Sequence, residues 1–98
     1  MSARKFNVRV AGVSYRQDAI RLCNVGDPVD FEHDEGNPYD ARAIAVYVDK
    51  RHIGFLPKDG WLTDFLLDQG GWAEGHIESI GGSPSGDLGV VLSIEKGQ

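Results

Sequence analysis

The sequence predicts a mainly β domain: a small six-stranded barrel, OB-like or SH3-like, with one main helix. Thirteen glycines separate short apolar runs along the 98 residues, as expected for a chain with many tight turns. Most of these runs either alternate apolar and polar residues or are rich in β-branched residues, which is typical of strands. A barrel is the expected arrangement because closure removes the exposed edges of a small sheet.

The first part of the chain predicts two strands and a helical turn. Residues 5–13 alternate apolar and polar side chains, the period of a half-buried strand. Residues 17–23 are expected to form a single helical turn, with Asp18 as its N-cap and Gly26 just beyond its end. The alternation returns in residues 28–33, which predict the second strand.

Four more strands are predicted in the rest of the chain. Residues 43–48 form an unbroken apolar run, and residues 52–56 follow it after a short polar turn, which indicates a hairpin. Residues 72–80 and 88–94 predict the last two strands, joined by a flexible connection over residues 81–87. The strand predicted for residues 72–80 is expected to carry on one face Ala73, Gly75, Ile77 and Ser79.

Residues 59–69 predict the main helix, because apolar residues recur there at i, i+3 and i+4. Asp59 is its expected N-cap, and Gly70 occupies the position of a C′ glycine. The apolar face consists of Leu62, Phe65 and Leu66. All these segments together predict a single domain over residues 1–98, with its core at about residues 5–95.

Composition narrows the class of protein. Ten Lys and Arg against fifteen Asp and Glu give a net charge of −5, which argues against a broad basic surface that would coat nucleic acid. The single cysteine, Cys23, excludes an internal disulfide and a multi-cysteine zinc finger. No apolar run could span a bilayer, and the N-terminus does not resemble a secretory signal. We therefore expect a cytoplasmic protein with no membrane partner.

The sharpest local pattern is Gly36-Asn37-Pro38-Tyr39-Asp40, just before a buried strand. It is good turn chemistry, because Pro38 fixes φ while Asn37 and Asp40 can bond nearby backbone groups. A turn alone does not require the aromatic ring of Tyr39, however. A ring on a stiff loop can stack on a nucleobase, and a neighbouring carboxylate accepts a hydrogen bond from a hydroxyl while repelling phosphate.

With these motifs the chain resembles the HIRAN domain family, known from the N-terminus of certain fork-remodelling helicases and as standalone bacterial proteins. The resemblance covers about residues 6–94, and the segment that begins at Asn37 is its most specific part. Its landmarks are Val10-Ala11-Gly12-Val13-Ser14-Tyr15, Val25-Gly26-Asp27, Asn37-Pro38-Tyr39-Asp40-Ala41-Arg42-Ala43-Ile44-Ala45-Val46 and His52-Ile53-Gly54-Phe55-Leu56-Pro57.

The resemblance implies an OB-like barrel that captures the 3′ end of single-stranded DNA. By its pattern, Tyr15 and Tyr39 enclose the terminal base, and Asp40 bonds the terminal 3′-hydroxyl. Asn37 shapes the loop and is a possible contact, and Lys58 meets phosphate. The family also implies a link to DNA repair and replication-fork processing, with DNA-processing proteins such as a helicase as partners.

The chain departs from the DNA-capturing members at several positions. Ser14 and Gly36 stand where those members carry a basic residue and an asparagine, and Phe55 replaces a histidine in the contact set. Arg16 and Arg42 are the remaining basic residues expected at the mouth, next to Tyr15 and Asp40. An acidic segment precedes the loop and would oppose phosphate if it faced the groove: Asp30, Glu32, Asp34 and Glu35.

We expect a non-catalytic protein without a cofactor. The three histidines and the cysteine lack the spacing of zinc ligands. No coupled nucleophile and base, magnesium motif or P-loop is present. The leading interpretation is a DNA-binding module for 3′-hydroxyl ends, and the alternative is a protein-interaction or small-ligand barrel that has lost DNA binding. Convergence of Arg16, Arg42 and Lys58 near Tyr39 would favour DNA, provided that Asp34 and Glu35 point away.

Overall fold

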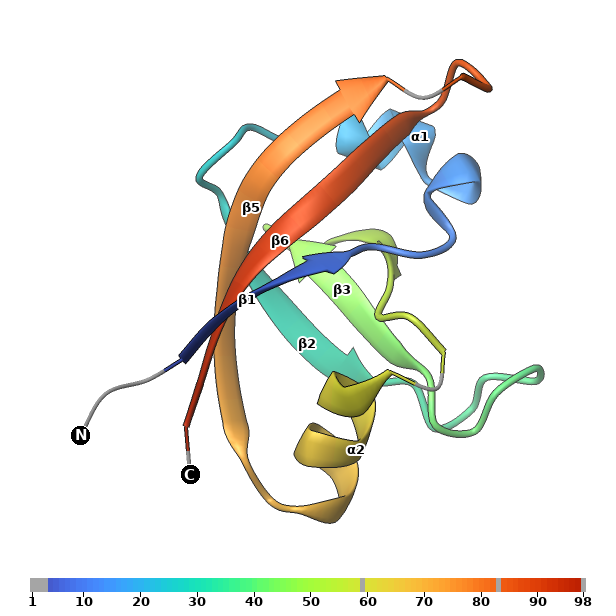
Figure 1. Ribbon diagram of the computed structural model, residues 1–98. Coiled ribbons are helices and arrows are strands. Elements are labelled where there is room, and N and C mark those ends of the chain that lie inside the picture. The colour runs from blue at the N-terminus through green and yellow to red at the C-terminus, as the bar shows by residue number, and fades with distance from the viewer. Residues whose placement is uncertain (1–3, 59, 83, 98) are drawn as a thin grey trace.

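The computed structural model describes residues 4–58, 60–82 and 84–97. A sheet curls around the molecule, and one helix covers its lower end, as Figure 1 shows. The elements in chain order are β1 (Arg4–Arg9), η1 (Val13–Tyr15), α1 (Gln17–Ile20), β2 (Pro28–His33), β3 (Ile44–Val48), β4 (Arg51–Phe55), α2 (Trp61–Asp68), β5 (Trp72–Gly82) and β6 (Leu88–Gly97). Among the described residues, no helix is long and apolar enough to cross a membrane.

The six strands form one antiparallel sheet in the order β1-β6-β5-β2-β3-β4. The two ends of this order approach each other, because Ala11, just after β1, forms an isolated bridge with Phe55 of β4. Their backbone groups exchange two hydrogen bonds, of 2.8 and 2.9 Å. The sheet is therefore a curled half-barrel with one main helix, which confirms the predicted fold class.

Gly54 makes this approach possible. A Cβ atom at this position would collide with the carbonyl oxygen of Ala11 and with Cγ1 of Val10. Only glycine lets the two backbones come this close. The bridge between Ala11 and Phe55 therefore depends on the missing side chain one residue earlier.

The core fills the inside of the curl. Its fully buried large side chains come from α1 and from strands β3 to β6: Ile20, Val46, Ile53, Ile77, Val90, Leu92 and Ile94. From α2, Leu62 and Phe65 are buried, as predicted, whereas Leu66 is only half-buried. The predicted C′ glycine is confirmed, since Gly70 has φ +66° directly after the helix.

The structure corrects several local predictions. The strand predicted for residues 5–13 ends at Arg9, and a 3-10 turn that the sequence did not reveal follows it. Asp18 lies inside the first turn of α1 rather than at its N-cap, which is Arg16. The N-cap of α2 is Gly60, and the predicted cap residue Asp59 lies outside the described residues.

The predicted face of β5 is wrong beyond Ile77. The pairing with β6 shifts by one residue between Ile77 and Ser79, as a β-bulge does. Ser79 is therefore exposed, and Ile80 takes the half-buried position instead. The strand also runs to Gly82, paired with Leu88, so part of the connection predicted to be flexible belongs to the β5–β6 hairpin.

Candidate nucleic-acid interface

The loop between β2 and β3 is braced from within by Asn37. Its Oδ1 accepts hydrogen bonds from the backbone N–H groups of Tyr39, at 2.8 Å, and of Asp40, at 3.0 Å. Its Nδ2 donates to Oδ2 of Asp34 at 3.3 Å. One side chain thus holds both ends of the sharp turn at Pro38, which agrees with the predicted loop-forming role of Asn37.

Asp40 closes the second half of the same loop. Its Oδ1 accepts the backbone N–H of Arg42 at 2.9 Å, and its carbonyl oxygen accepts that of Ala43 at 3.1 Å. The N–H of Asp34 donates to the carbonyl oxygen of Ala43 at 2.8 Å across the base of the loop. The turn interpretation of the motif is therefore correct, and it leaves the ring of Tyr39 unexplained.

The two tyrosine rings are the most exposed large hydrophobic side chains of the described chain. Tyr39 is 91% exposed, and Tyr15 is 87% exposed. Tyr15 ends the 3-10 turn η1, where its N–H donates to the carbonyl oxygen of Gly12 at 3.3 Å. Exposed aromatic rings on short, hydrogen-bonded segments lose little conformational freedom when a flat ligand stacks on them.

The outer face of the β3–β4 hairpin carries a row of rings. His52 lies between Tyr47 and Phe55, with ring centroids at 5.0 and 4.8 Å. A Cβ atom on Gly12, next to η1, would lie 3.6 Å from Cδ2 of Phe55. Phe55 is thus half-buried beside the turn that leads to Tyr15.

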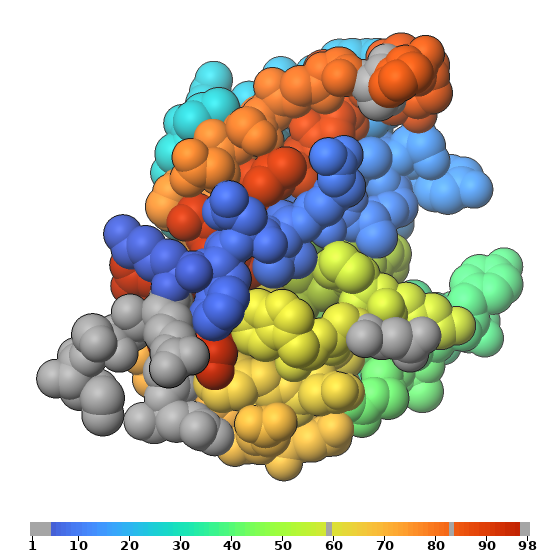
Figure 2. All heavy atoms as spheres, viewed as in Figure 1, coloured from blue at the N-terminus to red at the C-terminus, as the bar shows by residue number. Residues whose placement is uncertain are grey.

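The charge environment of His52 connects the two tyrosine-bearing segments. Partial burial lowers its pKa most, and the positive charge of Arg16 lowers it further. A hydrogen bond to the carbonyl oxygen of Gly54 and the charge of Asp34 act in the opposite direction. Arg16 follows Tyr15, whereas Asp34 belongs to the loop of Tyr39, so His52 lies within reach of both segments. Both project from the same side in Figure 2, the η1–α1 segment in blue and the β2–β3 loop in green.

Five of the predicted contact residues line two separate hollows. Tyr15 and Arg16 line an open one of about 540 Å³ together with His52. Asp40 and Lys58 line a much smaller one of about 40 Å³ between the loop and α2. The family resemblance implies that these residues contact one DNA end, and the structure distributes them over two hollows. The surface that carries the exposed rings of Tyr15 and Tyr39 is called the tyrosine rim below.

Arg42, expected at the mouth of the binding site, is bound to two carboxylates of α2. Its guanidinium group donates to Asp64 at 2.8 Å and to both carboxylate oxygens of Asp68 at 3.1 and 2.9 Å. Hydrogen bonds with these two carboxylates raise the pKa of Arg42, and the bond from Arg42 lowers the pKa of Asp68. Asp64 and Asp68, four residues apart on α2, therefore hold the loop against the helix through Arg42.

The acidic residues before the loop have different surroundings. The Asp34 carboxylate faces Asn37 inside the loop, and Glu35 lies 3.8 Å from Nδ1 of His33. Asp30 and Glu32 are exposed on β2. Among the described residues, no group of three or more His, Cys, Asp or Glu side chains could hold a metal ion.

The chain is similar to one known domain family and to solved structures. Residues 4–94 match the model of the HIRAN domain. No curated protein sequence matches the chain. The crystal structure of the HIRAN domain of human HLTF has a TM-score of 0.71 at 23% identity, over 96% of this chain and 76% of that one. A protein from Lactobacillus plantarum has a TM-score of 0.67 at 24% identity, over 96% and 97%. At these identities the likeness establishes the fold.

Proposed function

The chain belongs to the HIRAN domain family, and on that basis we propose that it is a non-catalytic module that binds single-stranded DNA and prefers an end with a free 3′-hydroxyl. By the same family relation it would act beside DNA-processing proteins such as a helicase, in repair or fork processing. Its composition, with a single cysteine, is what favours the cytoplasm as the location. The observation that carries the proposal is the pair of exposed tyrosines, Tyr15 and Tyr39, on two short segments that are held by internal hydrogen bonds.

Stacking supplies most of the affinity in this proposal. A base that stacks on an aromatic ring gains about 1 to 3 kcal/mol without preference for sequence. Tyr15 and Tyr39 would hold the last base or the last two bases, with Phe55 and His52 beneath them on the outer face of β4. The internal bonds of Asn37 keep Tyr39 in place before the DNA arrives.

Asp40 would distinguish a hydroxyl end from a phosphorylated one. A carboxylate has about four lone-pair positions, and the N–H of Arg42 occupies one of those on Oδ1. The carboxylate can therefore still accept a hydrogen bond from a terminal hydroxyl. A terminal phosphate would instead bring like charges together.

Arg16 and Lys58 are the proposed phosphate contacts. Arg42 is left out of this set, because its guanidinium group would have to leave Asp64 and Asp68 to reach DNA. Few cations on an acidic protein predict weak binding. Two phosphate contacts correspond to a slope of about −1.4 for the logarithm of the binding constant against the logarithm of the salt concentration.

The test is fluorescence anisotropy with labelled single-stranded oligonucleotides that end in a 3′-hydroxyl or a 3′-phosphate. We expect tighter binding of the hydroxyl end by the unchanged protein. Asp40→Asn keeps the hydrogen bond to Arg42 but removes the charge, so the preference should shrink while binding persists. Lys50→Ala, in the β3–β4 turn, is the control for loss of a cation away from the proposed contacts. Undetectable binding of both oligonucleotides at low salt would contradict the proposal and favour an interaction module without DNA. Equal, measurable binding of both would contradict the preference for a 3′-hydroxyl end.

A further inference from the structure

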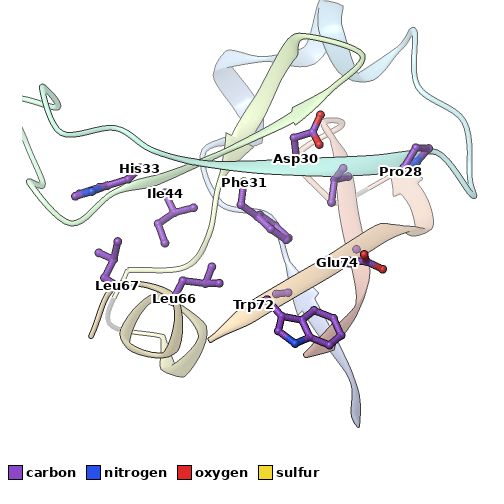
Figure 3. Close-up of a pocket in the computed structure, with 12 residues that line it drawn as sticks. Pro28, Asp30, Phe31, His33, Ile44, Leu66, Leu67, Trp72 and Glu74 are labelled. Carbon is purple, nitrogen blue, oxygen red and sulfur yellow. The ribbon is translucent and has the colours of Figure 1, made fainter. Parts of the chain in front are cut away.

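A recess distinct from the two hollows described above opens where β2 and β5 separate. The register between these strands contains Pro28↔His76 and Val29↔Gly75. β2 then continues to His33 beside β3, and β5 runs back to Trp72 beside β6. The widening gap is about 640 Å³ and reaches as far as α2. Figure 3 shows the two strands diverging, with the helix at the wide end.

The recess has an apolar floor that reaches the surface. Phe31 points from β2 towards the gap, and Leu66 and Leu67 approach it from the helix (Figure 3). Ile44 and Ala73 contribute further apolar surface. Trp72 is 48% exposed at the edge. Exposed apolar surface of this kind in a concave site marks a place for a partner.

The strand edges in the recess offer backbone hydrogen bonds. Ile77 N–H donates to the carbonyl oxygen of Asp27 at 2.9 Å, so odd-numbered residues of both strands direct their backbone groups across the gap. Alternation then directs the N–H and C=O groups of Phe31 and His33 on β2, and of Ala73 on β5, into the widening part. Strand edges with free backbone groups readily accept an added strand.

The charged side chains at the edge of the recess determine which kind of partner it can bind. The fully charged side chains that line the recess are Asp30 and Glu74, one on each strand, and both are acidic. Glu32 adds a further exposed carboxylate on β2. Phosphates would be repelled here. A second copy of the chain carries a net charge of −5 and is opposed in the same way.

We propose that this recess binds an extended peptide segment of a partner protein, one that alternates apolar and basic side chains, as a strand added between β2 and β5. The apolar side chains of the peptide would lie on Phe31, Leu66 and Ala73. Its basic side chains would face Asp30 and Glu74, and Trp72, on the same face of β5 as Glu74, would contact one of them with its ring. From Asp30 to His33 the free edge spans about 13 Å at about 3.3 Å per residue, so four or five peptide residues would be held. This surface is independent of the tyrosine rim and does not depend on DNA binding.

The test uses a short fluorescein-labelled peptide that alternates valine and lysine, measured by anisotropy with the full chain. A matched peptide that alternates valine and glutamate should bind about tenfold more weakly or worse, because it meets the acidic rim. N-methylation of the lysine peptide at alternate residues should abolish binding, because it removes the backbone donors from one edge. Equal binding of the lysine and glutamate peptides, survival of the N-methylated peptide, or no binding of any of the three would overturn the proposal.

Variants of the protein locate the site. Glu74→Lys reverses one rim charge at an exposed position and should weaken binding of the lysine peptide about tenfold. Glu78→Lys is the matched control, since it makes the same change on the same strand, beyond the residues that pair with β2 and outside the recess. Binding that is unaffected by Glu74→Lys would contradict the proposal. So would an oligonucleotide that displaces the peptide, or light scattering that shows self-association lost in Glu74→Lys, since these identify DNA or a second copy as the occupant.

Discussion

The tyrosine rim and the β2–β5 recess are built in different ways. The rim consists of two contiguous segments, each held by short-range hydrogen bonds, such as those from Asn37 to the next residues of its own loop. The recess joins residues of β2, α2 and β5, which extend along the chain from Pro28 to Gly75, and it exists because two strands stop pairing. A motif can therefore reveal the rim, whereas only the course of the strands reveals the recess.

The two surfaces also differ in charge and in backbone. The rim has Arg16 and Lys58 nearby and presents aromatic side chains. The recess has Asp30 and Glu74 and presents strand edges. These differences suit one surface to a nucleic-acid end and the other to a basic peptide. The following changes test how the tyrosine rim is held in place and whether it is separate from the recess, from the largest expected effect to the smallest.

The largest expected effect is that of Gly54→Ala. The added Cβ would collide with Ala11 and Val10 and force apart the bridge that seats η1 on β4. Overpacking of this kind costs about 1 to 3 kcal/mol or more, which corresponds to a fall in Tm of roughly 5 to 20 °C for a domain of this size. Thermal unfolding followed by circular dichroism measures it. Gly36→Ala is the control, since no atom lies within 4 Å of an added Cβ there, and an equal loss of stability in both variants would refute the role of Gly54.

Exchange of single aromatic residues should separate the two surfaces. Tyr39→Ala removes one stacking platform, so DNA should bind about 5- to 150-fold more weakly, while the peptide binds as before. Trp72→Ala should do the reverse, because Trp72 lines the recess and not the rim. Anisotropy with both ligands measures the four affinities. Loss of both ligands in either variant, with unchanged circular dichroism, would show that the surfaces are not separate.

A smaller effect is expected from Asn37→Ala. The variant keeps the ring of Tyr39 but removes the acceptor of two N–H groups, at a cost of about 1 kcal/mol. The loop should lose order, and DNA binding should weaken less than in Tyr39→Ala. Hydrogen exchange of the Tyr39 and Asp40 amides checks this expectation. Asn24→Ala, in the exposed turn before β2, should leave the exchange of both amides unchanged. A similar response to the two substitutions would contradict the role of Asn37 in holding the loop.

The smallest expected effect concerns the pair of Arg42 and Asp68. The pKa of Asp68 is lower in the folded state than its ordinary value, so the pair stabilises the protein above that value and loses its contribution as pH falls through the folded pKa. Stability should therefore decrease slightly more on acidification in the unchanged protein than in Asp68→Asn. Unfolding curves between neutral pH and pH about 3 compare the two. Parallel pH profiles would show that the tether does not contribute.

Much of the architecture followed from patterns along the chain. The structure confirms three features that were predicted from neighbouring residues: the strand in residues 28–33, the strand in the apolar run of residues 43–48, and the glycine after α2. The β5 bulge could not be predicted in this way, because its shift is set by pairing with Val91 and Leu92 on another strand. The ion pairs of Arg42 could have been expected from one pattern in the sequence. Asp64 and Asp68 lie at i and i+4 on a helix, and two carboxylates at that spacing can bind one guanidinium group.

By itself, the sequence determined the fold class, the HIRAN family and the braced loop that carries Tyr39, since each depends on the order of residues close together in the chain. Tertiary structure alone decided that Arg42 is bound to α2 and that Tyr15 and Asp40 line different hollows. It also decided that β2 and β5 separate and leave a recess with an apolar floor and acidic residues at its edges. The physical reason is that hydrogen-bonded turns are short-range, whereas charge pairing and strand separation depend on segments that meet only after the sheet has curled.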